Sequence, residues 1–345
     1  MRKLLLFLVC SVSLSAQKTE FIKLLKQVKD PKKMYGKFLV IDQRDVPEIG
    51  LVTFNKEKVA VAFENNAEKD ISDWLYKDNP TEAKGEFVFQ LEKLTVDEEI
   101  TEKSSVTKLE IKGSSFLKTS DGYHFLNRID TMAAISSRNT PNRPQSIAKK
   151  TDFILGSFIK KSFERKPWQI PLAENELKNY ETFLPERAEI FKTEIPKDGI
   201  YKDYQSLAAQ TTAPGFVMEF DKKGVATKAV NGEQKLRLYE IYAFVHNGVP
   251  FKTIPVGYVE IMRDREGLFI QVKREELYPD SSPGFIMIGG GLGGLIGSAV
   301  ANIAIVAVDR SMAKKRQALP GETVSLDPLT GNYIIPEDFG NTKKK

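Results

Sequence analysis

The chain has 345 residues, of which 41% are hydrophobic and 28% are charged, and it carries a formal net charge of +5. This length can hold about two domains of ordinary size, and the composition is that of a folded protein rather than of a disordered one. Because the charge is small for the length and the basic residues are spread along the chain, a nucleic-acid-binding surface is not expected.

Residues 1–16 have the layout of a secretory signal peptide. Arg2 and Lys3 form a positive start, an apolar run covers Leu4–Val12, and small or weakly polar residues lead to Ala16. This order predicts export and cleavage after Ala16. An uncleaved membrane anchor is the alternative, but the apolar run is short for a bilayer.

The only cysteine, Cys10, lies within this predicted signal peptide. Bulky residues precede it where a lipoprotein signal has small ones, so lipid attachment at Cys10 is not favoured. Cleavage would leave a mature protein with no thiol, and therefore with no disulfide and no thiolate metal site.

Residues 17–166 are predicted to form an exported α+β domain. It opens with Phe21, Leu24, Leu25 and Val28, which recur at helical spacing among lysines. This pattern predicts a short amphipathic helix that packs on the domain, with a membrane-surface or partner helix as the alternative.

Strands are expected next, at 38–44, on both sides of 55–58, at 86–100, and on both sides of a turn at 120–122. A helix then follows, with Ser146 as its cap. Its predicted buried face holds Ile147, Ile154, Leu155, Phe158, Ile159 and Phe163, and its predicted solvent face holds Lys149, Lys150, Lys160 and Lys161.

Residues 167–199 contain four prolines and are interpreted as an ordered connector. Residues 200–284 are predicted to form a small β-rich domain that opens with a short helix. Its turns are expected at 221–224, 247–248 and 265–267. Its alternating aromatic residues are interpreted as core and cross-strand pairs rather than as a ligand platform: Tyr239, Tyr242, Phe244 and Tyr258.

The segment 283–317 can be interpreted in two ways. Gly289, Gly291 and Gly294 match the spacing G-x-G-x-x-G, and Asp309 follows, which locally resembles the opening of a Rossmann dinucleotide fold. However, no turn residue separates a helix from a returning strand between Leu292 and Val308, and little chain remains to build a doubly wound sheet. The nucleotide interpretation is therefore not favoured.

The favoured interpretation is a transmembrane helix at 285–308, because these residues carry no charge and are long enough as a helix to cross a hydrocarbon core. Small residues recur at steps of four, and the segment resembles the glycine-zipper helices of bacterial envelope proteins. The predicted helix–helix interface consists of Gly289, Gly293, Gly297, Ala301 and Asn302.

The cations after this segment, among them Arg310 and Arg316, predict a cytoplasmic tail by the positive-inside rule, with the bulk of the chain outside the cytoplasm. A glycine-rich helix or helical hairpin buried within an exported protein is the alternative. The tail, 309–345, is basic and polar, and its residues 322–336 form a predicted hairpin. That hairpin would be more stable if it packed against the preceding sheet. A membrane-spanning helix at 285–308 would instead place it on the other side of the membrane from that sheet.

The sequence contains few groups for catalysis or metal binding. His124 and His246 have no partner at ligand spacing, and the acidic run 97–99 lacks the spacing of a calcium loop. Asp130 and Glu110 are candidates for a carboxylate pair that the sequence cannot place. Neither a G-x-S-x-G motif nor a phosphate-binding loop is present, and no cofactor is predicted.

Together these features predict an α+β protein with two β-rich, mainly antiparallel domains and a C-terminal apolar glycine-rich helix. The predicted function is that of a non-enzymatic, membrane-anchored bacterial envelope protein with a binding or assembly role. Its predicted partners are the lipid bilayer, further copies of itself through the glycine face, and an envelope protein whose identity the sequence does not give. A secreted soluble hydrolase and a periplasmic binding module are the alternatives.

Overall fold

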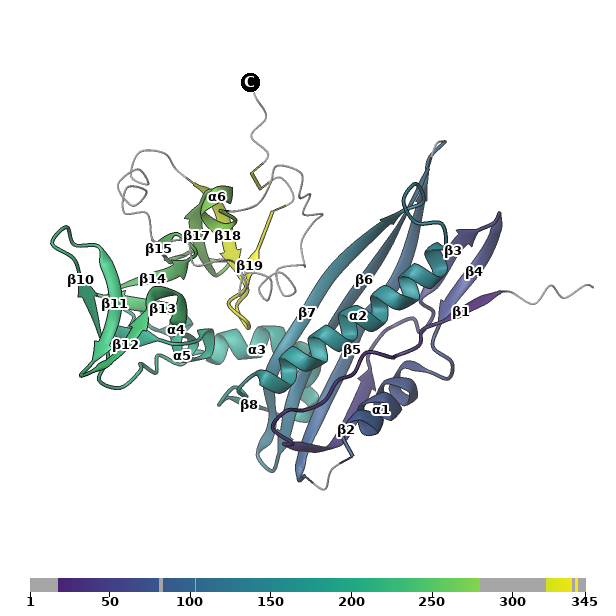
Figure 1. The fold of residues 1–345 in the computed structure, drawn as a ribbon. Coiled ribbons are helices and arrows are strands. Elements are labelled where there is room, and N and C mark those ends of the chain that lie inside the picture. The colour runs from purple at the N-terminus through teal and green to yellow at the C-terminus, as the bar shows by residue number, and fades with distance from the viewer. Residues whose placement is uncertain (1–17, 81–82, 103, 280–320, 337–338, 341–345) are drawn as a thin grey trace, which may run out of the picture.

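The computed structural model describes residues 18–80, 83–102, 104–279, 321–336 and 339–340. Over these residues the fold is α+β, with mixed and mainly antiparallel sheets and few helices, as the sequence predicts (Figure 1). The predicted signal peptide and the predicted glycine-rich helix at 285–308 lie outside the described residues.

The first half of the chain builds one large sheet with the strand order β1-β4-β3-β5-β6-β7-β8, and β2 pairs with β5. Its long strands β5, β6 and β7 are antiparallel, whereas β1 pairs with β4, and β2 and β3 pair with β5, in parallel. The predicted strands are confirmed. The sheet comprises β1 Thr19–Phe21, β2 Tyr35–Asp42, β3 Gly50–Phe54, β4 Glu57–Ala62, β5 Gly85–Ile100, β6 Ser105–Thr119, β7 Gly122–Ser136 and β8 Pro171–Leu172.

Two helices, α1 (Ala67–Asp78) and α2 (Arg143–Glu164), pack on this sheet, and α2 runs across β5–β7 (Figure 1). The predicted apolar face of α2 is confirmed, because Ile147, Leu155 and Phe163 are fully buried in the first core cluster. The helix begins three residues before the predicted cap, since the side chain of Asn142 accepts the N–H of Gln145 at 3.2 Å.

The helix predicted around residues 21–28 is wrong. After β1 the chain is extended, and its backbone is bonded by side chains of the two helices rather than by its own turns. Asp152 of α2 accepts the N–H groups of Leu25 at 2.9 Å and Lys26 at 3.0 Å, and Asp78 accepts that of Val28 at 2.7 Å. These partners are distant in sequence, so the helical spacing of the apolar residues did not decide the structure.

The predicted connector is more regular than expected, because it holds one 3₁₀ helix and two short α-helices. They are η1 Glu174–Asn179, α3 Tyr180–Arg187 and α4 Glu189–Lys192. Its residues Leu177, Tyr180 and Leu184 are buried in a second core cluster. That cluster also contains Val88 and Phe125 of the large sheet, so residues of both predicted domains share one core.

Three smaller sheets follow, and the predicted short helix and all three predicted turns are present. The elements are β9 Gly199–Tyr201, α5 Tyr204–Ala208, β10 Val217–Phe220, β11 Ala226–Asn231, β12 Gln234–Arg237, η2 Leu238–Glu240, β13 Ala243–His246, β14 Val249–Ile254, β15 Gly257–Glu260, β16 Met262–Arg263, β17 Leu268–Val272 and α6 Arg274–Leu277. The aromatic residues are partly core, as predicted: Phe244 stacks on its cross-strand partner Phe251 at 5.1 Å, whereas Tyr239 is 58% exposed.

The hairpin near the C-terminus joins the preceding sheet. β18 (Glu322–Leu326) pairs antiparallel with β17 along its whole length, and β19 (Tyr333–Ile334) pairs with β18. The fully buried Val324 lies opposite the fully buried Ile270, so the pairing contributes to the second core cluster.

This pairing corrects one part of the predicted topology. If residues 285–308 crossed a bilayer once, β17 and β18 would lie on opposite sides of it and could not pair. The prediction that the tail is cytoplasmic while the bulk of the chain is exported is therefore wrong for residues 322–334. Within the described ranges, no helix is both long and apolar enough to span a membrane.

Candidate functional site

The turn between β18 and β19 connects the two halves of the molecule, which also share the second core cluster. Asp327 organises it, because one carboxylate oxygen accepts the N–H groups of Leu329 and Thr330, each at 2.9 Å. The other oxygen accepts Nε of Arg128, on β7, at 2.7 Å. Arg128 also donates to Glu181 of α3. The turn is thus bonded to the large sheet and, through Arg128, to the connector.

The turn also fits closely over two tyrosines. Tyr204 donates its hydroxyl to the carbonyl of Pro328 at 2.9 Å, and Tyr242 donates to that of Gly331 at 2.8 Å. A Cβ at position 331 would lie 2.4 Å from Cγ of Tyr204, and the backbone there has a φ of +67°. Both the close approach and the left-handed conformation therefore require glycine.

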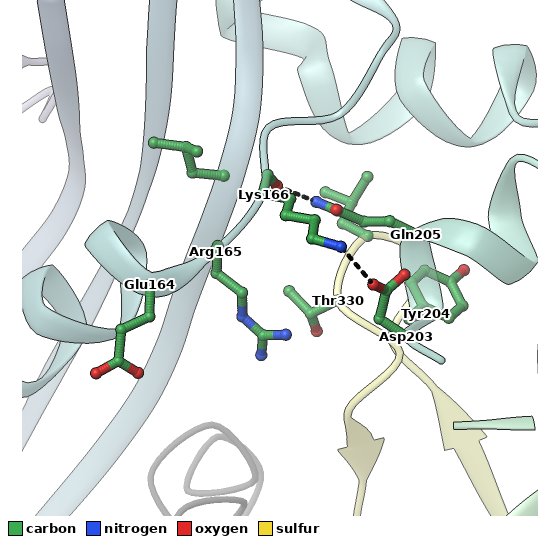
Figure 2. Close-up of a pocket in the computed structure, with 9 residues that line it drawn as sticks. Glu164, Arg165, Lys166, Asp203, Tyr204, Gln205 and Thr330 are labelled. Atoms are coloured by element: carbon green, nitrogen blue, oxygen red, sulfur yellow. Dashed lines mark hydrogen bonds and ion pairs between the residues drawn. The ribbon is translucent and has the colours of Figure 1, made fainter. Parts of the chain in front are cut away.

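A pocket of about 200 Å³ lies where α2 ends, beside the first residues of α5 and this turn (Figure 2). Leu126 of the large sheet is one of its lining residues. The other lining residues come from three separate segments: Glu164, Arg165 and Lys166; Asp203, Tyr204 and Gln205; Leu329 and Thr330. The wall is tied together by Gln205, whose side-chain amide donates to the carbonyl of Lys166 at 2.5 Å.

The charged side chains of the pocket differ in their partners and in the direction in which they point. Lys166 Nζ lies 3.9 Å from Asp203 Oδ2, and Asp203 also caps α5 by accepting the N–H of Ser206 at 2.8 Å. The guanidinium of Arg165 points into the space toward Thr330, whereas the carboxylate of Glu164 points away from it (Figure 2). The pocket therefore offers a guanidinium and a hydroxyl to a small anion, beside a weak ammonium–carboxylate pair.

A buried lysine contacts Tyr242, whose ring packs against that of the lining residue Tyr204. Lys252 of β14 is 8% exposed, and its ammonium lies 3.9 Å from the centre of the Tyr242 ring and 5.6 Å from that of Tyr333. It donates to the carbonyl of Thr253 at 3.0 Å. Burial lowers the pKa of Lys252 to about 7. Because Lys252 does not line the pocket, we assign it to packing and not to ligand contact.

The histidines and carboxylates considered from sequence are structural or solvent-facing. His124 Nδ1 lies 2.6 Å from the carbonyl of Trp168, and the ring centres of His246 and Phe220 are 4.5 Å apart. Glu110 forms an ion pair with Lys93, and Asp130 lies opposite Lys112 in the β6–β7 register. Across the described parts of the chain, no three His, Cys, Asp or Glu residues are grouped to hold a metal.

The predicted interface residues Gly289, Gly293, Gly297, Ala301 and Asn302 lie outside the described residues, so their assignment stays a prediction. The pocket residues were not predicted from sequence. Arg165, Asp203 and Thr330 are far apart along the chain, and the predicted hairpin at 322–336 and the predicted short helix after residue 200 gave no sign that these segments meet.

No family model matches the chain, and no curated protein matches it.

Proposed function

We propose that this chain is an exported bacterial envelope protein with a binding or assembly role, attached to a membrane through residues 285–308 and self-associating through their glycine face. The observation that carries the proposal is the position of this uncharged segment between β17 and β18, which are paired strands of one sheet. A long apolar insertion between the two inner strands of a four-stranded sheet is costly in water if it stays exposed, and lipid or another copy of the same segment would cover it.

The pairing also defines the topology that we propose. Since Val272 at the end of β17 lies opposite Glu322 at the start of β18, both ends of the insertion begin at the same place on the folded body. Both ends of the segment would therefore lie on the same side of the membrane. The folded body and the tail would both stay on the exported side.

The test combines extraction and protease access in cells. The wild-type protein should stay in the membrane pellet after carbonate washing, and a variant with a Gly-Ser linker in place of 285–308 should be released. A tag after Lys345 should be cut by external protease together with the body. A protected tag would contradict the one-sided topology, and release of the wild-type protein by carbonate would contradict attachment.

Self-association is tested with a matched pair of substitutions. Gly297→Leu adds bulk on the predicted glycine face, whereas Ala299→Leu adds bulk on the other side of the helix. Cross-linked oligomers should decrease with Gly297→Leu and persist with Ala299→Leu, while both proteins stay in the membrane fraction. Equal oligomers in both variants would contradict the glycine interface.

A second candidate function, a binding module for small anions, is favoured by the Arg165 guanidinium in the pocket. Inorganic phosphate and acetate, added at constant ionic strength, should raise the melting temperature of the wild-type protein. The rise should be lost in Arg165→Gln and kept in Lys222→Gln, which removes an exposed lysine elsewhere. An equal rise in all three proteins would contradict a pocket site.

A further inference from the structure

A basic surface with apolar tips lies where the extended segment after β1 crosses α2. We call it the lysine–phenylalanine face and define it by Lys23, Leu25, Lys26, Lys150, Phe153 and Lys160. Its two apolar side chains are unusually open, because Leu25 is 76% exposed and Phe153 is 49% exposed. Exposed apolar side chains among cations are typical of surfaces that bind a lipid interface.

The face is held in place by specific contacts. Lys26 Nζ lies 3.9 Å above the Phe153 ring and donates to Ser157 Oγ at 2.7 Å. The stem of Lys26 lies across α2 at Gly156, where a Cβ would come within 2.6 Å of Lys26 Cδ. Lys150 lies over the same ring at 5.5 Å. Leu25 and Phe153 are therefore presented together on a fixed surface and not on a free chain end.

The positive charge of the face is balanced only in part from within, by the attraction between Lys26 and Asp152. Asp152, the carboxylate beside it, already accepts two backbone N–H groups, those of Leu25 and Lys26. Among the described residues, no carboxylate lies within ion-pair distance of Lys23, Lys150 or Lys160. Burial and repulsion from Lys160 lower the pKa of Lys26, although attraction to Asp152 opposes the shift. An external anion would relieve this repulsion.

We propose that the lysine–phenylalanine face docks on an anionic lipid surface, with Leu25 and Phe153 entering the headgroup layer and the lysines contacting lipid phosphates. The inference deepens the proposed membrane attachment, on which it rests, by naming the lipid class that the folded body recognises. Juxtamembrane lysines each add to binding to anionic membranes, about fivefold per residue, and salt weakens this contribution. An acidic protein would satisfy the lysines but would leave the two apolar tips less well covered.

The experiment uses the full mature chain and two kinds of vesicle, pure phosphatidylcholine and phosphatidylcholine with a minor fraction of phosphatidylglycerol. Binding to neutral vesicles measures attachment through 285–308. The additional binding to anionic vesicles measures docking through the lysine–phenylalanine face. The face variant carries Lys23→Gln, Lys150→Gln and Lys160→Gln. The control variant carries Lys222→Gln, Lys223→Gln and Lys235→Gln, which remove the same charge from exposed positions elsewhere.

The wild-type and control proteins should gain at least tenfold on anionic vesicles at low salt, and the face variant should lose most of that gain. A second variant, Leu25→Ser with Phe153→Ser, should lose part of it without any change in charge. Circular dichroism melting curves should be equal for all four proteins.

Two results would overturn the inference: no anionic gain for the wild-type protein, which would leave an acidic protein as the partner class, or an equal loss in the face and control variants. Failure of the proposed attachment gives a different pattern. The wild-type protein would then not bind neutral vesicles, whatever the face variant does on anionic ones.

Discussion

The two halves of the molecule bury a basic side chain in opposite ways. In the first half, Arg143, the first residue of α2, pairs with Glu98 of β5, whose side chain is 3% exposed. In the second half, Lys252 is enclosed by two tyrosine rings and backbone carbonyls, and no carboxylate of the described residues lies within ion-pair distance of it. Burying a charged group costs less free energy when it is paired with an opposite charge than when it is unpaired.

The difference between the paired and the unpaired basic side chain is also visible in the pKa values. Burial alone would raise the pKa of Glu98, but hydrogen bonds from Thr53, Lys58 and Arg143 outweigh it and lower the pKa to about 2. For Lys252 burial acts without such compensation and lowers the pKa to about 7. The first half should therefore lose stability in acid, and the second should gain stability as the pH rises above neutrality.

The largest expected effect is that of Glu98→Gln. It leaves Arg143 buried without its counterion and should cost about 4 kcal/mol of unfolding free energy. In the wild-type protein the depressed pKa gives stability that is present above pH 4.5 and is lost as the pH falls toward about 2. The variant should lack this part of the acid dependence, which urea denaturation at several pH values measures.

The two tryptophans allow the effect to be located. Trp74 belongs to the first core cluster and Trp168 to the second. In a Trp168→Phe background, Glu98→Gln should shift the fluorescence transition of Trp74. Glu98→Gln can also be made in a Trp74→Phe background, where Trp168 reports the transition. If that transition shifted as much as that of Trp74, the two halves would unfold as one unit and would not differ in stability.

The next effect is that of Leu326→Ala in β18. Leu326 is 2% exposed in the second core cluster and lies opposite Leu268 of β17. Truncation should cost about 3 kcal/mol, since it removes buried methyl groups and leaves a cavity. The Trp168 transition should move to lower urea concentration, and that of Trp74 should move less. An unchanged Trp168 transition would show that the hairpin is not docked in this core.

The smallest effect is that of Lys252→Met, which keeps the linear side chain without the ammonium. It should raise the unfolding free energy at pH 7 by about 2 kcal/mol. Because the unfolded lysine holds its proton up to its ordinary pKa of 10.5, whereas the folded one loses it near 7, the wild-type protein should gain stability between these pH values.

The Lys252→Met variant should lack that gain, which thermal melts from pH 7 to pH 10 would measure. Lys235→Met, at an exposed position, is the matched control and should keep the wild-type pH profile. A Lys252→Met profile as steep as that of the wild-type protein would mean that other groups cause the dependence.

The strands of both halves were predictable because their signals are local. Alternating apolar residues and turn residues predicted β6 and β7 around 120–122 and the turn at 247–248, and each lies where expected. Helix α1 was missed, although Asn66 caps it and Ile71, Trp74 and Leu75 form its buried face. The segment 21–28 was predicted wrongly, because side chains of Asp78 and Asp152 bond its backbone from elsewhere in the chain.

The sequence by itself determined the α+β class and the positions of most strands. It also determined that an uncharged, glycine-rich segment needs an apolar environment to cover it. Tertiary structure alone decided that β18 pairs with β17, that Arg128 contacts Asp327, and that Arg165 and Thr330 line one pocket. The physical reason is the range of the interactions. Alternation and turn chemistry act over a few residues, whereas pairing across a long insertion depends on which buried surfaces fit together.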